Sequence, residues 1–221
     1  MFATLHCSLR LRGKPDHWGE KLYGRVACGG SLIAPKWVLT AAHCGGSLGP
    51  MAEAGKQIRR IRNVFVHPGY NRRPLDNDFM LLELDAPAQL NNYVNTINLA
   101  TRCPSPGTRC VVSGWGTIRS PQSMACWGVG GRLSVSQARC QDIYRGRITE
   151  NMFCAGVEQG GISTCKGDSG GPLVCNGKLQ GVVSWGKSIC ARPGQPRVYA
   201  NVCKAVQWVR STIRSRLARS D

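Results

Sequence analysis

The chain has 221 residues, of which 42% are hydrophobic and 19% charged, a balance that is typical of a folded domain and excludes extensive disorder. A net charge of +17 favours contact with polyanions such as heparin-like glycans, nucleic acid or anionic membrane, and a solvated basic surface explains it equally well. Twelve cysteines without a C-x-x-C pair argue against a zinc site and favour disulfides formed in an oxidising compartment.

The first residues, MFATLHCSLRLRGK, have neither a basic start nor a long apolar run, so they do not have the pattern of a signal peptide. No apolar run elsewhere is long enough to predict a membrane span. A disulfide-rich chain needs export, and we therefore expect that the sequence lacks residues encoded upstream.

Short apolar runs bounded by Gly and Pro predict strands, which in chain order lie in GGSLIAPKWVLT, FMLLELDAP, TRCVVSGWG and GGPLVCNGKLQGVVSWG. The Asn-Gly pair of CNGK predicts a hairpin at 175–178. SVSQARCQDIY predicts an internal helix whose serines suit the N-cap. A C-terminal helix is predicted because Val206, Val209 and Ile213 recur at helical spacing. Many short strands with two helices predict an all-β sandwich or pair of barrels.

Three residues are candidates for a catalytic site. His43 follows a predicted strand in LTAAHC, Asp78 precedes one in LDNDFMLLEL, and Ser169 lies in GDSGGP. Each has a structural explanation when taken alone, as a core histidine, a turn cap or a loop serine. Together, in the order His, Asp, Ser, they have the chain order of the catalytic triad of chymotrypsin.

Motifs along most of the chain resemble those of chymotrypsin-fold serine peptidases of the tissue kallikrein family, namely CGGSLIAPKWVLTAAHC, DNDFMLLEL, SGWGTIRSP, FCAGVEQGG, GDSGGPLVC and GVVSWG. The resemblance implies an all-β fold of two packed six-stranded antiparallel β-barrels with a short internal helix and a C-terminal helix. It implies a single peptidase domain over 1–221, with barrels near 15–105 and 106–202 and the helix near 203–217.

The resemblance also implies the catalytic roles. Ser169 would attack the scissile carbonyl, His43 would accept its proton and pass it to the leaving amine, and Asp78 would hold the imidazole. The N–H groups of Gly167 and Ser169 would form the oxyanion hole. Asp168 would form the activation pocket. The substrate-binding residues would be Ser163, Thr164, Lys166, Ser184, Trp185, Gly186 and Arg197.

The twelve cysteines form six pairs in the pattern that the resemblance implies. These are Cys7–Cys126, Cys28–Cys44, Cys103–Cys203, Cys110–Cys175, Cys140–Cys154 and Cys165–Cys190.

Three departures from the family concern activation and stability. Relatives gain an Ile-Val-Gly-Gly-like terminus that pairs with the aspartate corresponding to Asp168, and this chain has MFAT at that place, which predicts a zymogen-like state with a collapsed oxyanion hole. Only 35 positions separate His43 from Asp78, and we expect the first barrel to lack about one strand. The stretch SPQSMACWGVGGRLSVSQARC also differs from the family on both sides of Cys126.

A fourth departure concerns specificity. Trypsin-like relatives have an aspartate six positions before the nucleophile, where this chain has Ser163, and a glycine where it has Arg197. The missing negative charge and the added positive charge predict cleavage after Asp or Glu, or no cleavage, in preference to cleavage after Arg or Lys. The alternative is that Arg197 extends to solvent.

The leading hypothesis is a secreted, extracellular serine endopeptidase, monomeric and without cofactor or metal. Its partners would be protein or peptide substrates, protein protease inhibitors and heparin-like polyanions. The alternative is a catalytically inactive homologue or zymogen-like form that binds polyanions or protein partners. An incomplete sequence would explain the first two departures but not Arg197.

Overall fold

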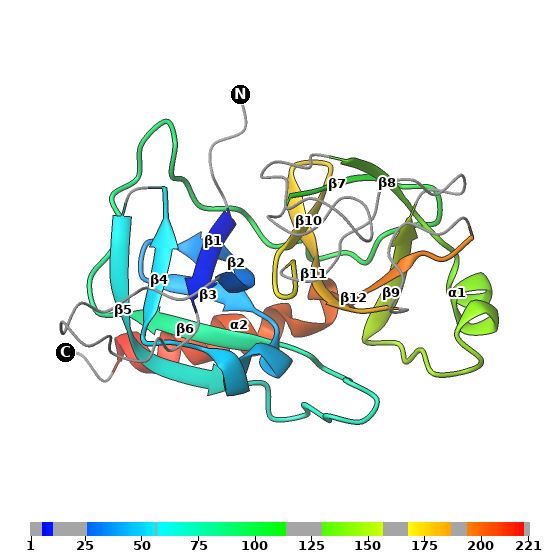
Figure 1. Cartoon of the computed structure of the whole chain (residues 1–221), viewed down its shortest axis with the longest axis horizontal. Helices are drawn as coiled ribbons and strands as arrows, with labels where there is room; N and C mark the ends of the chain where they lie inside the picture. The colour runs from blue at the N-terminus through cyan, green and yellow to red at the C-terminus, as the bar shows by residue number, and fades with distance from the viewer. Residues whose placement is uncertain are drawn as a thin grey trace, which may run out of the picture.

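Two closed six-stranded antiparallel barrels lie side by side in the computed structural model (Figure 1), which describes residues 6–10, 26–55, 57–113, 130–156, 168–186 and 194–218. The predicted fold class is therefore confirmed. Buried hydrophobic side chains of the described residues form the core of each barrel, and the last helix packs across the back of the first barrel.

The first barrel has the strand order β1-β2-β3-β6-β5-β4 and closes through pairing of β1 with β4. Its strands are β1 (His6–Arg10), β2 (Val26–Ala34), β3 (Trp37–Thr40), β4 (Met51–Ala54), β5 (Gln57–Val66) and β6 (Met80–Leu84). The expectation that this barrel lacks a strand is wrong, because β4 and β5 both fit between His43 and Asp78. The barrel begins before residue 15, since β1 fills the gap between β2 and β4.

The second barrel has the order β10-β11-β12-β9-β8-β7. Its strands are β7 (Arg109–Val112), β8 (Gly130–Ser134), β9 (Met152–Gly156), β10 (Pro172–Cys175), β11 (Lys178–Trp185) and β12 (Arg197–Asn201). Asn176 and Gly177 connect β10 to β11 with φ values of 51° and 72°. The predicted hairpin is confirmed, and its two positive φ values explain why Asn-Gly suits this turn.

Both predicted helices are present. Helix α1 (Gln137–Ile143) begins after Ser136, whose hydroxyl accepts a hydrogen bond from the N–H of Arg139. Helix α2 (Val202–Leu217) leaves the second barrel and runs back along the first (Figure 1). It buries Val202, Ala205, Val206 and Val209 in the core of the first barrel, as amphipathic spacing requires.

Four disulfides are present among the described residues: Cys28–Cys44, Cys103–Cys203, Cys110–Cys175 and Cys140–Cys154. All four are among the pairs that the kallikrein resemblance implies. The other two, Cys7–Cys126 and Cys165–Cys190, involve side chains outside the described part of the chain. No helix in the described ranges is both long and apolar enough to cross a membrane.

Candidate active site

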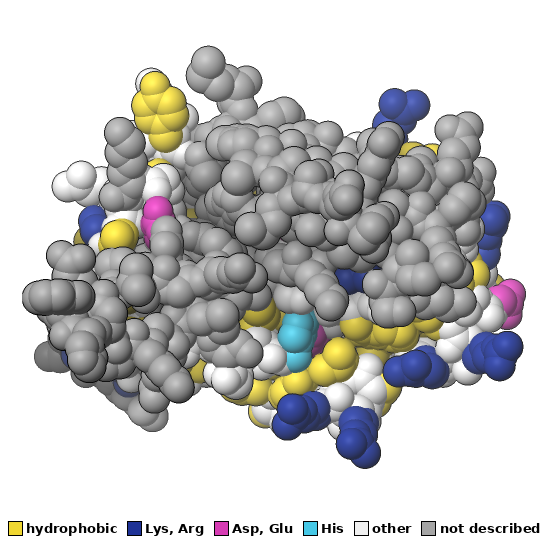
Figure 2. Space-filling view, viewed as in Figure 1, with side chains coloured by type: hydrophobic (Ala, Val, Ile, Leu, Met, Phe, Trp, Pro, Cys, Tyr) yellow, Lys and Arg dark blue, Asp and Glu magenta, His cyan; other side chains and the backbone are white. Residues whose placement is uncertain are grey.

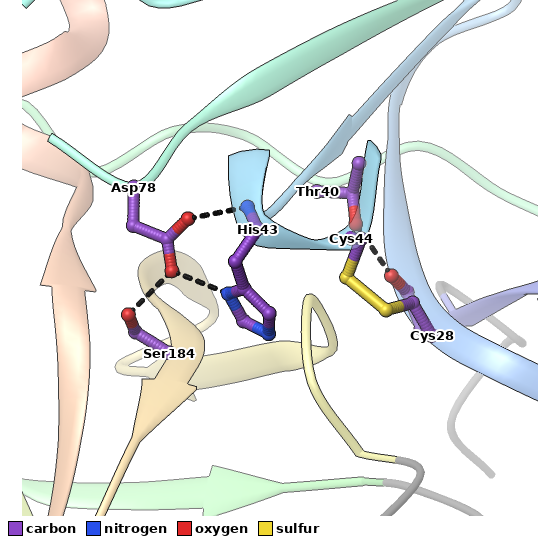
Figure 3. Close-up of a disulfide and its surroundings, with 7 residues drawn as sticks. Cys28, Thr40, His43, Cys44, Asp78 and Ser184 are labelled. Carbon is purple, nitrogen blue, oxygen red and sulfur yellow. Dashed lines mark hydrogen bonds and ion pairs between the residues drawn. A yellow bond between two sulfur atoms is a disulfide. The ribbon is translucent and has the colours of Figure 1, made fainter. Parts of the chain in front are cut away.

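Strand pairing places His43 beside Asp78. Strands β3 and β6 are antiparallel, with Thr40 opposite Met80. His43 follows Thr40 on the short 3-10 helix η1 (Ala42–Ser47), and Asp78 precedes Met80, so both residues lie at the same edge of the barrel. The imidazole Nδ1 is 2.7 Å from Oδ2 of Asp78, as Figure 3 shows.

The carboxylate of Asp78 is fully buried and accepts three hydrogen bonds. Its Oδ1 accepts the backbone N–H of His43 at 2.9 Å, and its Oδ2 accepts the Ser184 hydroxyl at 2.5 Å as well as the imidazole (Figure 3). These donors compensate the cost of burying a charge. An ionised carboxylate can only accept, so Nδ1 carries the hydrogen and Nε2 is left to accept a proton.

Ser169 lies on a tight turn between the two barrels. Its carbonyl accepts the N–H of Gly29 on β2 at 2.7 Å, and the N–H of Gly170 donates to Val183 on β11 at 2.8 Å. The turn is closed by a 2.9 Å hydrogen bond from the N–H of Gly171 to the carbonyl of Asp168. The nucleophile candidate is thus held by backbone contacts to a strand of each barrel.

Gly170 brings this turn against the segment that carries His43. Its φ is 80°, and a Cβ at this position would lie 2.2 Å from Oγ1 of Thr40 and 3.2 Å from the N atom of Ala41. No side chain fits there, which explains a glycine directly after the serine. Ser169 therefore lies next to the β3–η1 connection that ends in His43.

The Cys28–Cys44 disulfide fixes η1 to β2 next to the catalytic histidine candidate (Figure 3). Thr40 adds a 2.8 Å hydrogen bond from its hydroxyl to the carbonyl of Gly29. Because Gly29 also contacts Ser169, one short stretch of β2 positions both the histidine segment and the serine turn.

Arg197 lies at the start of β12, against Gly186, which directly follows β11. A Cβ on Gly186 would be 2.8 Å from Nη1 of Arg197, so the guanidinium covers this glycine. Burial lowers the pKa of Arg197, and the nearby Tyr199, Tyr144 and Asp168 oppose that decrease. Asp168 is itself only 4% exposed, and its carboxylate interacts electrostatically with the guanidinium of Arg197.

The structure brings together His43, Asp78 and Ser184. Trp185, the last residue of β11, and Gly186 directly follow Ser184. The remaining predicted residues Gly167, Ser163, Thr164 and Lys166 lie outside the described residues. Among the described residues, no group of three His, Cys, Asp or Glu is arranged to hold a metal ion.

Two cationic residues near the site were missed. Arg147 lies over the ring of Trp185, with its Cζ 5.1 Å from the centroid, and Arg145 lines the same groove. Both follow α1 and are far from β11 in sequence, and no motif marks them. Arg72 and Arg73 stand out in the sequence as a basic pair, but their place in the groove depends on the fold.

Comparison with known proteins agrees with this geometry. The sequence matches the Trypsin family over residues 12–209. It is 47% identical to human Kallikrein-14 over 206 residues, covering 87% of this chain and 76% of that protein. Trypsin-3 of Salmo salar is also 47% identical, over 202 residues that cover 85% and 83% of the two chains. Human Kallikrein-5 is 44% identical over 206 residues, covering 86% and 69%. The chain therefore belongs to the trypsin family of serine endopeptidases.

Proposed function

We propose that the chain is a secreted, extracellular endopeptidase that hydrolyses peptide bonds through an acyl-enzyme on Ser169. The observation that carries the proposal is the buried Asp78 carboxylate, which holds the ring of His43 next to the turn of Ser169. A buried carboxylate with an oriented histidine and a nearby serine is the arrangement that activates a hydroxyl nucleophile.

In the proposed reaction, Nε2 of His43 takes the Ser169 proton as the oxygen attacks the substrate carbonyl. The imidazolium is stabilised by Asp78 and then gives the proton to the leaving amine, which breaks the peptide bond. Water, deprotonated by His43 in the same way, hydrolyses the ester and restores Ser169. The N–H groups of Ser169 and Gly167 would bind the oxyanion, each contributing about 3 kcal/mol to the transition state.

For the residue before the scissile bond, we propose a preference for Asp or Glu over Arg or Lys. The half-buried guanidinium of Arg197 lies against Gly186, which supports a role in the pocket more than an extension to solvent. An acidic substrate side chain would pair with this guanidinium. Profiling with short peptides tests this, and fast cleavage after Arg would contradict it.

The oligomeric state and the binding partners are proposed from the family and from the net charge. We propose that the chain is a monomer that protein protease inhibitors block, as fits a trypsin-family peptidase. The net charge of +17 supports an interaction with heparin-like polyanions. Retention on a heparin column should then fall steeply with salt, because such contacts release counterions. Retention that does not change with salt would exclude this partner class.

The test of the main proposal is labelling of the oxidised, folded chain with a fluorophosphonate probe, with Ser169→Ala as control. These probes react with a serine that its histidine activates. Labelling that depends on Ser169 is the expected result. A folded chain that is not labelled would favour the alternative, an inactive or zymogen-like form. A variant that begins Ile-Val-Gly-Gly separates these two, since only a zymogen-like chain would gain labelling.

A further inference from the structure

A groove with a volume of about 920 Å³ opens beside the catalytic pair. One wall contains Trp185 and Gly186, which directly follow Ser184, the residue that donates to Asp78. The opposite wall contains Leu75, three residues before Asp78. A peptide bound for cleavage would therefore extend through this groove.

Four arginines line the groove. Arg72 and Arg73 come from the loop that leads to Asp78, and Arg145 and Arg147 come from the segment after α1. All four side chains are exposed. Lys and Arg side chains also gather along the lower edge of the face in Figure 2, next to hydrophobic surface. The groove is thus cationic on both walls.

Two nearby carboxylates of the described residues, those of Asp76 and Glu150, have partners other than the groove arginines. Asp76 accepts hydrogen bonds from Oγ1 of Thr149 at 2.5 Å and from Nδ2 of Asn151 at 3.1 Å. Glu150 pairs with Lys204 at 2.7 Å. Within the described ranges, no ion pair joins any of the four groove arginines to a carboxylate. Their charge is therefore available to a ligand.

Two aromatic side chains, Trp185 and Tyr144, position one of the four guanidinium groups. The ring of Trp185 contacts Tyr144 edge to face, with centroids 4.9 Å apart, and Arg147 lies over the ring. A cation–π contact fixes the guanidinium plane and leaves its outer N–H groups free to bind a carboxylate.

We infer that this groove recognises Asp or Glu side chains in the two to four substrate residues that precede the scissile bond. The inference rests on the proposed peptidase function. The direction follows from Gly186, which joins the groove to Arg197 and hence to the pocket proposed for the residue before that bond. An extended substrate that enters the pocket from the groove would place the residues preceding the scissile bond among the four arginines.

The kinetic test compares two peptides that share one cleavage site and carry either Glu or Gln at the preceding positions. Each exposed ion pair is weak, so we expect a combined preference of about 3- to 10-fold in kcat/KM for the Glu peptide, and less at high salt. The double variant Arg72→Gln/Arg73→Gln should lose most of this preference, measured as the ratio of the kcat/KM values for the Glu and Gln peptides. Arg145→Gln, tested alone, should lose part of it.

The matched control is Arg60→Gln/Arg62→Gln. Both residues are exposed on β5, outside the groove, and the variant loses the same net charge. It should keep the preference for the Glu peptide. Equal losses in the two double variants would overturn the inference, because the overall charge and not the groove would then attract the substrate. No preference in the unaltered chain would overturn it as well.

A binding measurement separates this inference from the peptidase proposal. The Ser169→Ala chain should bind the labelled Glu peptide more tightly than the Gln peptide, whether or not the unaltered chain is catalytic. Preferential binding of the Glu peptide without fluorophosphonate labelling would support the groove and favour an inactive or zymogen-like form over an active peptidase. Labelling without any preference for the Glu peptide would support the peptidase and contradict the inference about the groove.

A heparin oligosaccharide tests whether the groove binds glycans instead. We expect it to bind the groove variant and the unaltered chain equally and not to displace the Glu peptide. The groove would instead be a glycan site if heparin displaced the Glu peptide and if the groove variant lost heparin binding.

Discussion

The hydroxyl of Ser184 donates a 2.5 Å hydrogen bond to Oδ2 of Asp78, although 106 positions separate the two residues in the sequence. The bond joins the second barrel, which carries Ser184 on β11, to the loop before β6 in the first. It therefore orients the carboxylate of Asp78 and joins the two barrels at the candidate active site.

Ser184→Ala should lower kcat/KM about 10-fold, because a hydrogen bond to a charged group contributes about 1.5 kcal/mol or more. The measurement is steady-state kinetics on one peptide substrate. Ser31→Ala is the matched control, since this serine is also fully buried but its hydroxyl has no hydrogen-bond partner in the described part of the chain. Similar losses in both variants would contradict the role assigned to Ser184.

Gly170→Ala should abolish fluorophosphonate labelling and lower the free energy of unfolding by about 3 kcal/mol or more. The new Cβ would lie 2.2 Å from Oγ1 of Thr40 at a φ of 80°, so the serine turn must move. Gly146→Ala is the control, because it has a φ of 72° and open space around its Cβ position. The control should cost only about 1 kcal/mol and keep its labelling. Equal effects would show that backbone strain alone matters.

Stability should fall as the pH drops below about 6.5 through His67. Burial lowers the pKa of His67 from 6.5, against a smaller opposing effect of Asp76. The unfolded chain thus binds the proton more readily, and acid favours unfolding between 6.5 and the lower pKa of the folded state. In addition, protonation removes Nδ1 as the acceptor of the Gly69 N–H at 3.1 Å.

Chemical denaturation of the unaltered chain and of His67→Gln between pH 7.5 and 5 measures this contribution. The variant loses the ring contact with Trp208, so its stability is lower at every pH, and the change with pH is the relevant quantity. We expect the free energy of unfolding to decrease less steeply with falling pH in the variant than in the unaltered chain. If the two curves of unfolding free energy against pH were parallel, groups other than His67 would cause the pH dependence.

Arg216→Ala should lower the free energy of unfolding by about 1–2 kcal/mol, because it removes a charged partner from a nearly buried carboxylate. Nε of Arg216 is 3.3 Å from Oε2 of Glu83, whose other partner is Nδ2 of Asn63 at 2.7 Å. Its guanidinium also lies over the ring of Phe65. These contacts attach α2 to β5 and β6.

Arg214→Ala is the control for this prediction. Arg214 is exposed on the same helix, two positions away, and its loss should change stability by less than about 0.5 kcal/mol. Thermal unfolding of the two variants gives the comparison. If both were equally stable, the link between α2 and Glu83 would carry no net stabilisation.

Local sequence was sufficient for both α-helices, for one hairpin and part of the strands, and for the identity of the chemical groups. The Asn-Gly hairpin, the Ser136 cap and the apolar spacing of α2 all depend on residues a few positions apart, and each is present in the structure. The His, Asp and Ser motifs could be identified in the same way, because each is a short segment with its own pattern. Disulfide pairing required the family resemblance, since twelve cysteines alone allow many pairings.

Only the tertiary structure decided how these groups meet. The register of β3 against β6 puts His43 at Asp78, and the packing of the two barrels puts Ser184 on the same carboxylate. The first barrel also closes with six strands, whereas the short spacing between His43 and Asp78 had predicted one strand fewer. The arginine groove has the same origin, because its two walls come from different barrels. Contacts between distant segments depend on strand register and barrel packing, which no local pattern of residues specifies.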